Sequence, residues 1–203
     1  MGLLQLFGGL IFLATLVSAA DPQDRSSIWK DAIGSGFKED TTQLGFSAGG
    51  AIGVKALGTQ VEHDFYMGNV NAGWIFTDVV CPDKWWSGNW ELRGELFGGQ
   101  QLEPSRYLVG GTLALRYHFV THTPLVPFIQ GGAGLSATDI REPDLSTDFE
   151  FNLMTGVGAH YFLTDRTAIT LEYRLFHLSN AGIDTPNTGV NSHAILAGVT
   201  WWF

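Results

Sequence analysis

The chain has little cysteine and little positive charge. Its single cysteine, Cys81, cannot form a disulfide within the chain, so no disulfide framework defines the fold. Lys and Arg together number 11 against 20 Asp and Glu, which gives a formal net charge of −9. Because proteins bind nucleic acids through basic patches that neutralise phosphates, this balance argues against a nucleic-acid partner.

Long apolar runs are absent after the first twenty residues. Residues 1–20 carry no charged side chain and end in the small residues Ser18, Ala19 and Ala20, which predicts a secretory signal peptide over 1–20. An uncleaved membrane anchor is the alternative for this segment. No other segment has the roughly twenty apolar residues that a membrane helix needs. Any further membrane contact must therefore come from strands.

Metal and nucleotide signatures are also missing from the sequence. The six histidines are scattered along the chain, and the closest pair, His118 and His122, has no carboxylate nearby. A metal site needs three or four convergent ligands, so we expect no metal. No glycine-rich phosphate loop follows a strand and opens a helix, so we expect no nucleotide and no other cofactor.

What the sequence does contain is alternation of apolar and polar residues. Residues 21–40 are polar and do not alternate, which indicates a periplasmic N-terminal lead-in, whereas 41–203 alternates almost throughout. Side chains of a strand point alternately to its two faces, so this pattern predicts strands with one apolar face. Eight strands are predicted, over about 42–57, 61–77, 88–98, 106–119, 124–137, 148–162, 166–179 and 190–203.

Charged residues recur on one face of several of these strands. Both signs are present, which allows them to pair across a narrow lumen, while the opposite faces are apolar enough to meet lipid. The pattern predicts an all-β protein, an eight-stranded antiparallel transmembrane β-barrel of up-and-down topology, over 41–203. The predicted lumen-facing ion-pair residues are Glu91, Arg93, Glu95, Arg116, Glu150, Glu172 and Arg174.

The connections predict how the barrel is oriented. Those at 120–123 and 163–165 are short, as periplasmic turns are, whereas 100–105, 138–147 and 180–189 are longer and are expected to face outward. The segment 78–87 is long for a periplasmic turn and fits this scheme poorly. The chain ends in Trp201, Trp202 and Phe203, and such an aromatic end resembles the assembly signal of bacterial outer-membrane barrels. The predicted location is therefore the bacterial outer membrane.

Three polar residues lie on strand faces that should meet lipid. His177 and Ser179 continue the apolar face of strand 166–179, and Asn191 continues that of strand 190–203. Unpaired polar groups are costly at such positions and are usually functional. A serine hydroxyl attacks an ester when a base takes its proton and a third group orients the base. The pattern predicts Ser179 as nucleophile, His177 as base and Asn191 as the orienting amide.

The loop that joins these two strands offers donors for an oxyanion hole. Asn180 and Asn187 carry side-chain amides, and backbone N–H groups lie around Ala181 and Gly182. Such donors stabilise the negative charge that develops on a carbonyl oxygen during attack. We therefore expect these four residues beside the nucleophile, which would place a complete esterase site within one hairpin.

The hairpin sequence FHLSNAGIDTPNTGVNS resembles the C-terminal signature of the outer-membrane lipid A 3-O-deacylases of the PagL type. The resemblance implies an eight-stranded barrel whose site lies on the outer wall, faces the outer leaflet and removes the acyl chain ester-linked at position 3 of lipid A. By motif, Ser179 matches the nucleophile, His177 the base, and Asn180 and Asn187 the oxyanion hole.

The chain departs from that family at Asn191, where its best-known members have Glu. An asparagine can orient an imidazole but cannot offset the charge of an imidazolium. Asp184 in the adjoining loop is an alternative source of negative charge.

Two other functions are compatible with the sequence. One is a non-catalytic structural or adhesive outer-membrane barrel, in which Asn191 marks a degenerate triad. The other is a soluble periplasmic barrel of lipocalin type, with the apolar faces turned inward. The aromatic C-terminus and the short turns disfavour the second. The sequence leaves a homodimer open.

Overall fold

The computed structural model describes residues 27–203 except residue 102. The predicted signal peptide over 1–20 and the first part of the lead-in lie outside the described residues. Eight strands make up the fold: β1 (Thr42–Gly53), β2 (Phe65–Ile75), β3 (Gly88–Gln101), β4 (Arg106–Phe119), β5 (Leu125–Thr138), β6 (Phe149–Phe162), β7 (Thr167–Ser179) and β8 (Val190–Trp202). No helix in this described part is long and apolar enough to cross a membrane.

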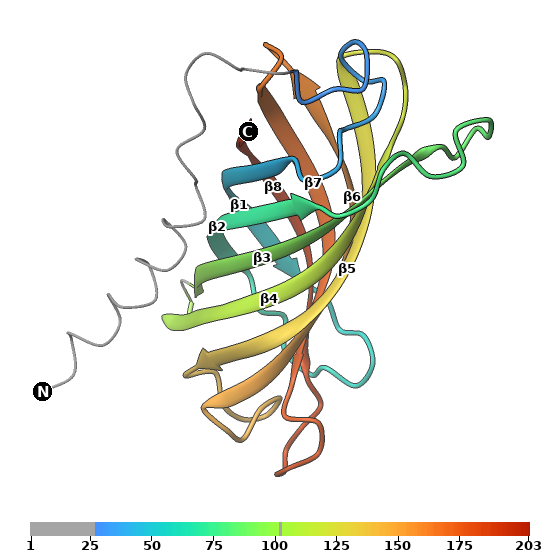
Figure 1. Ribbon diagram of the computed structural model, residues 1–203. Helices are drawn as coiled ribbons and strands as arrows, with labels where there is room; N and C mark the ends of the chain where they lie inside the picture. Colours follow the sequence, from blue (N-terminus) through green and yellow to red (C-terminus); the bar gives the residue numbers. More distant parts are fainter. Residues whose placement is uncertain (1–26, 102) are drawn as a thin grey trace, which may run out of the picture.

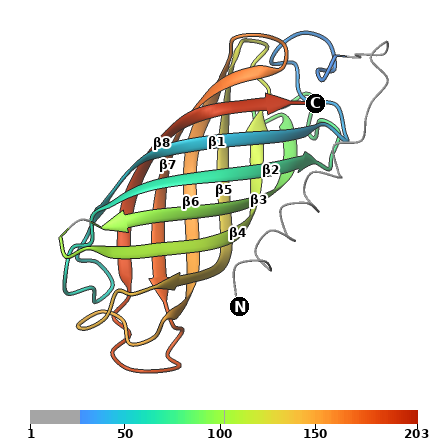
Figure 2. The same ribbon diagram turned by 90° about the vertical axis from the view of Figure 1, so that its left-hand side faces the viewer.

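The strands form a closed barrel in chain order (Figures 1 and 2). Each strand pairs antiparallel with its neighbours in sequence, and β1 pairs with β8 to close the sheet. This confirms the predicted eight-stranded, up-and-down antiparallel barrel. Closure leaves no strand edge unpaired, which is the condition for placing β-structure in lipid.

Two predicted strands are too long. β1 ends at Gly53 and β2 begins at Phe65, so residues 54–64 form a loop instead of a short turn. The chain leaves the sheet there because Leu57 and Gly58 have positive φ angles of 53° and 103°, and because the Asp64 carboxylate accepts a hydrogen bond from the Gly53 N–H at 2.8 Å.

Buried and exposed side chains alternate along the strands, as the apolar and polar alternation of the sequence predicts. On β3, Glu91, Arg93 and Glu95 are buried, whereas Trp90 and Leu92 are exposed on the outer wall. The same exposed apolar pattern recurs around the barrel, which gives it the apolar outer wall of a transmembrane β-barrel. Charged residues, and not apolar ones, line the middle of the lumen, which distinguishes this barrel from one of lipocalin type.

The middle of the lumen holds the predicted ion pairs. Both Arg174 guanidinium N–H₂ groups reach the Glu95 carboxylate at 2.5 and 2.6 Å, and Arg116 reaches Glu172 at 3.2 Å. Glu150, by contrast, bonds Thr147 at 2.7 Å and joins none of these pairs. The cavity beside Arg93 and Arg116 measures only about 10 Å³, so side chains fill this part of the lumen.

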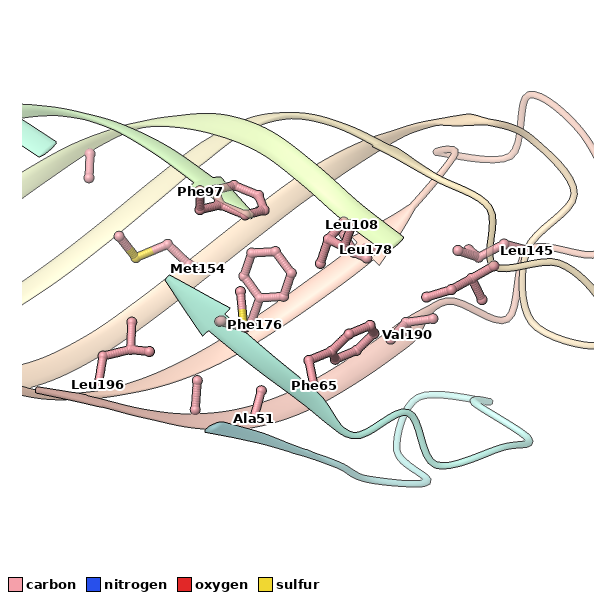
Figure 3. Close-up of a cluster of buried hydrophobic side chains, with 14 residues drawn as sticks. Ala51, Phe65, Phe97, Leu108, Leu145, Met154, Phe176, Leu178, Val190 and Leu196 are labelled. Atoms are coloured by element: carbon pink, nitrogen blue, oxygen red, sulfur yellow. The ribbon is translucent and has the colours of Figure 1, made fainter. Parts of the chain in front are cut away.

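The two ends of the lumen are filled by apolar clusters. Toward one end, Phe65, Phe97, Phe176 and Leu178 pack with ten other buried residues (Figure 3). At the opposite end the N-terminal segment 27–40 folds back onto the barrel, and Phe37 stacks on Trp202 with ring centroids 4.3 Å apart. The lumen is thus closed, and it leaves the outer wall as the surface that can meet a substrate.

We define the loop end of the barrel as the end that carries the connections 54–64, 103–105, 139–148 and 180–189. Connections 54–64, 139–148 and 180–189 lie in the lower part of Figure 1, away from segment 27–40 at the top. The connections 76–87, 120–124 and 163–166 lie at the other end with the C-terminus. The predicted division of connections between the two ends is therefore observed.

Replacing Arg174 with leucine should lower the free energy of unfolding by about 3–5 kcal/mol, because two buried carboxylates then lose a partner. Urea unfolding in detergent, followed by tryptophan fluorescence, measures this. Leu171→Met on the outer wall is the control and should cost less than about 1.5 kcal/mol. Equal midpoints for the two variants would contradict the account of the lumen.

Candidate active site

His177 and Ser179 lie near the end of β7 on the outer wall, as their parity predicts. Both are partly exposed, whereas Leu178 between them is fully buried in the lumen. In the sheet, His177 is paired with Asn191 of β8, and Ser179 with Phe151 of β6. The hairpin therefore brings the three predicted residues together at the loop end.

Asn191 accepts a hydrogen bond from the His177 ring. The distance from His177 Nδ1 to Asn191 Oδ1 is 2.8 Å. The Asn191 amide nitrogen donates to the Ala56 carbonyl at 2.9 Å and to the Thr59 hydroxyl at 2.6 Å. The Thr59 hydroxyl in turn donates to the Gly189 carbonyl at 2.8 Å.

These contacts fix the tautomer of His177. Because both hydrogens of the Asn191 amide point to acceptors in loop 54–64, its oxygen must be the atom that faces His177. An oxygen acceptor requires Nδ1 to carry the hydrogen, so Nε2 is left with a free lone pair. That is the form of histidine that acts as a general base.

The Ser179 hydroxyl makes no hydrogen bond to His177 in the described part of the chain, and His177 Nε2 is likewise without a partner there. Residues two apart on one strand face have Cα atoms about 6–7 Å apart, which is within reach for the two side chains after a rotamer change. Catalytic hydrogen bonds are often long before substrate binds. The geometry is that of a serine and a base that a bound ester would bring together.

The four predicted oxyanion residues divide into two kinds. Asn180 is buried: its N–H donates to Asn187 Oδ1 at 2.9 Å, and its amide nitrogen donates to Ser146 and to the Asp184 carbonyl. The Gly182 N–H donates to Asn180 Oδ1 at 2.9 Å. Asn180 and Gly182 thus have their donors occupied in shaping the loop.

Two donors stay unoccupied in the described residues, namely the Ala181 N–H and the Asn187 side-chain amide nitrogen. Ala181 has a φ of 56°, an uncommon conformation for a residue with a side chain. Such strain is typical of functional loops. Asp184, the alternative source of negative charge, is exposed and accepts from the Thr185 N–H at 2.8 Å. It makes no ion pair with His177 in the described chain.

Gly189 packs directly against the His177 ring. A Cβ atom at this position would lie 2.7 Å from His177 Cε1 and 3.0 Å from the Leu178 carbonyl oxygen. Its φ of 78° also disfavours any other residue. No sequence pattern marks Gly189, although it stands two residues before Asn191.

Asp144 ties three loops together beside the site. Its carboxylate accepts from the Thr188 hydroxyl at 2.5 Å and from the N–H groups of Gln60 and Val61 at 2.6 and 3.0 Å. Its carbonyl oxygen accepts from the N–H groups of Thr188 and Gly189. Loop 54–64, loop 139–148 and loop 180–189 therefore hold one another in place around His177.

The charge of Asp144 is stabilised within this junction. Burial alone would raise the pKa of its carboxyl, but hydrogen bonds from Thr188, from the Gln60 and Val61 N–H groups and from His63 lower the pKa below its ordinary value. A carboxylate that accepts several N–H and O–H bonds favours its ionised form. Asp144 is thus a charged anchor for the loops, and nothing in the sequence pattern marked it.

Among the described residues, no group of three or more histidine, cysteine, aspartate or glutamate side chains could hold a metal ion. The donors at the site are a hydroxyl, an imidazole and amides.

Two solved structures have the same fold. The crystal structure of the outer membrane enzyme PagL is 19% identical, covers 76% of this chain and 97% of its own, and has a TM-score of 0.58. The crystal structure of Neisserial surface protein A is also 19% identical, covers 81% of this chain and 100% of its own, and has a TM-score of 0.60. These likenesses show the fold alone.

Sequence comparison is more specific than the fold. No curated protein sequence matches the chain. The family model described as lipid A 3-O-deacylase (PagL), however, matches residues 55–200, which include loop 54–64 almost entirely and the β7–β8 hairpin up to Thr200. The match spans well over half of the chain, and the chain therefore belongs to the lipid A 3-O-deacylase (PagL) family.

Proposed function

We propose that this protein is an outer-membrane serine esterase that removes the acyl chain ester-linked at position 3 of lipid A. The observation that carries the proposal is the hydrogen bond from His177 Nδ1 to Asn191 Oδ1, on the same face of the barrel as Ser179. It leaves a basic nitrogen beside a hydroxyl on a wall that meets lipid. Family membership supplies the substrate class.

In the proposed reaction, His177 Nε2 takes the Ser179 proton while the serine oxygen attacks the ester carbonyl carbon. The carbonyl oxygen becomes an oxyanion, which the Ala181 N–H and the Asn187 amide are free to bind. The intermediate collapses, the bond to the sugar oxygen breaks, and His177 returns the proton to that oxygen. A water molecule then hydrolyses the acyl-serine with His177 again as base.

The loop end faces the outer leaflet in this proposal. Lipid A is a lipid of that leaflet, and the longer connections of outer-membrane barrels lie on the outer side. The opposite end is closed by the N-terminal segment, whose Trp29 donates a hydrogen bond to the Asp165 carbonyl at 3.1 Å. Ser179, the last residue of β7 and directly before loop 180–189, would then lie near the level of the lipid headgroups.

Asn191 supports this chemistry in a limited way. It holds the tautomer of His177, but as a neutral group it does not offset the positive charge that His177 gains in the transition state. We therefore expect slower turnover than with a carboxylate of the same geometry. The alternative function, a non-catalytic barrel with a degenerate triad, would be favoured by unchanged lipid A in cells that contain the folded protein.

Replacing Ser179 with alanine should abolish deacylation, because no other hydroxyl shares its position beside His177. Mass spectrometry of lipid A from expressing cells should reveal loss of one 3-hydroxyacyl chain with the unmodified protein only. Heat-modifiable migration on gels serves as the control that both barrels are folded. Deacylation that persists in Ser179→Ala would remove Ser179 from the mechanism.

Asn191→Leu should lower kcat by about 10² to 10⁴-fold, since a wrong tautomer costs about 10⁴ in a serine protease. Asn191→Asp keeps an acceptor for His177 Nδ1 and should retain at least tenfold more activity than Asn191→Leu. Deacylation rates on purified lipid A in detergent measure both. Equal rates for the two variants would mean that the Nδ1 contact does not matter.

Gly189→Ala should reduce activity by roughly a hundredfold, the cost of displacing a catalytic group by about 1 Å, because the new methyl group displaces the His177 ring. Gly182→Ala is the matched control: its φ of 82° is similar, but a Cβ there meets nothing within 4 Å. Both variants carry similar backbone strain, so the contacts of the new methyl group with His177 and with the Leu178 carbonyl oxygen separate them. Similar losses in the two would show that strain alone is responsible.

A further inference from the structure

A second polar pair lies on the outer wall, deeper than the catalytic residues. The Tyr173 hydroxyl is hydrogen-bonded to His193 Nδ1, and the two rings stack with centroids 5.8 Å apart at 28°. His193 is paired with Leu175 in the sheet, two residues farther from the loop end than the pairing of His177 with Asn191. The proposed reaction uses neither residue.

The depth of the pair separates it from the aromatic girdles. β7 runs from Thr167 to Ser179, so Tyr173 stands at its middle, with Leu171 and Leu175 exposed on either side. Girdle aromatics lie at strand ends, at the level of the headgroups. Along β7, Ser179 is six residues from Tyr173 and four from Leu175, the residue paired with His193. On a tilted strand this separation is about 13–20 Å along the strand and roughly 10–14 Å in depth. The pair therefore meets acyl chains.

One hydrogen of the pair is left without an acceptor. A neutral tyrosine and a neutral histidine bring one O–H and one N–H between them, and their mutual hydrogen bond uses one of these. The other stays unpaired in the described chain, whichever ring nitrogen carries it. An unpaired donor in hydrocarbon costs free energy, and ionisable residues at such positions are usually functional.

We propose that Tyr173 and His193 form a second binding point for the lipid. The spare hydrogen is donated to a carbonyl or hydroxyl oxygen carried by an acyl chain that lies along β7 and β8. Chain oxygens are the acceptors that a lipid offers below its headgroup. Holding one of them on this wall selects which ester of a multiply acylated lipid reaches Ser179. That selection rests on the proposed function, whereas the binding itself does not.

The test uses the inactive Ser179→Ala protein in detergent, with Tyr173→Phe and His193→Leu added together. Both changes are needed, because either residue alone still keeps a free donor. Binding is measured by native mass spectrometry for two synthetic lipid A monosaccharides. One has ester- and amide-linked acyl chains, and the other has ether-linked alkyl chains without carbonyl or hydroxyl groups.

The double change should weaken binding of the acyl lipid by roughly three- to tenfold, as loss of one membrane hydrogen bond does, and leave binding of the ether lipid unchanged. Leu175→Met, which keeps the pair, should bind both lipids as the parent does. Equal binding of the acyl lipid with and without the pair would overturn the proposal, and so would an equal loss for both lipids.

This outcome is independent of catalysis. If the protein with Ser179 intact leaves lipid A unchanged, the proposed esterase function fails, but selective loss of acyl-lipid binding would still establish the Tyr173–His193 site. Conversely, normal deacylation together with unchanged binding would remove the site and leave the esterase in place.

Discussion

Closure of the sheet imposes one constraint on every strand residue: its side chain points either into a narrow lumen or out of the barrel. The lumen is filled by the Arg174–Glu95 ion pair in the middle and by apolar clusters toward both ends. Such a filled interior has no room for a substrate. Any side chain that reacts with a lipid must therefore point out of the barrel. There it needs hydrogen-bond partners from other parts of the chain.

The Asn191 amide nitrogen, which points outward, finds its hydrogen-bond partners in a loop. Asn191 finds two acceptors in loop 54–64, and that loop is in turn held by the Asp144 carboxylate from the β5–β6 connection. A hydrogen-bonded amide costs much less in an apolar setting than a free one. The candidate site lies at the loop end of the wall, where His177 and Ser179 near the end of β7 meet Asn191 near the start of β8.

The sequence predicted the barrel and the serine–histidine–asparagine face because both follow from a period of two residues within single strands. Contacts between distant parts of the chain leave no such period. Thr59 meets Asn191 across 132 positions, and Phe37 reaches Asn89 across 52. Residues 54–57 continue the apolar alternation of β1, so the sequence predicts a strand there and does not reveal that loop 54–64 lies beside Asn191. The occupied donors of Asn180 likewise depend on the loop conformation.

An asparagine differs from a carboxylate in having two unlike ends. Rotation of a carboxylate by half a turn offers His177 the same acceptor, whereas rotation of the Asn191 amide offers a donor and moves the ring hydrogen to Nε2, which removes the base. What prevents this rotation is the backbone oxygen of Ala56 with the hydroxyl of Thr59. In the proposed reaction, the basicity of His177 Nε2 thus depends on two hydrogen-bond acceptors in loop 54–64 that bond Asn191. Loss of those acceptors would silence the site with hardly any atom displaced.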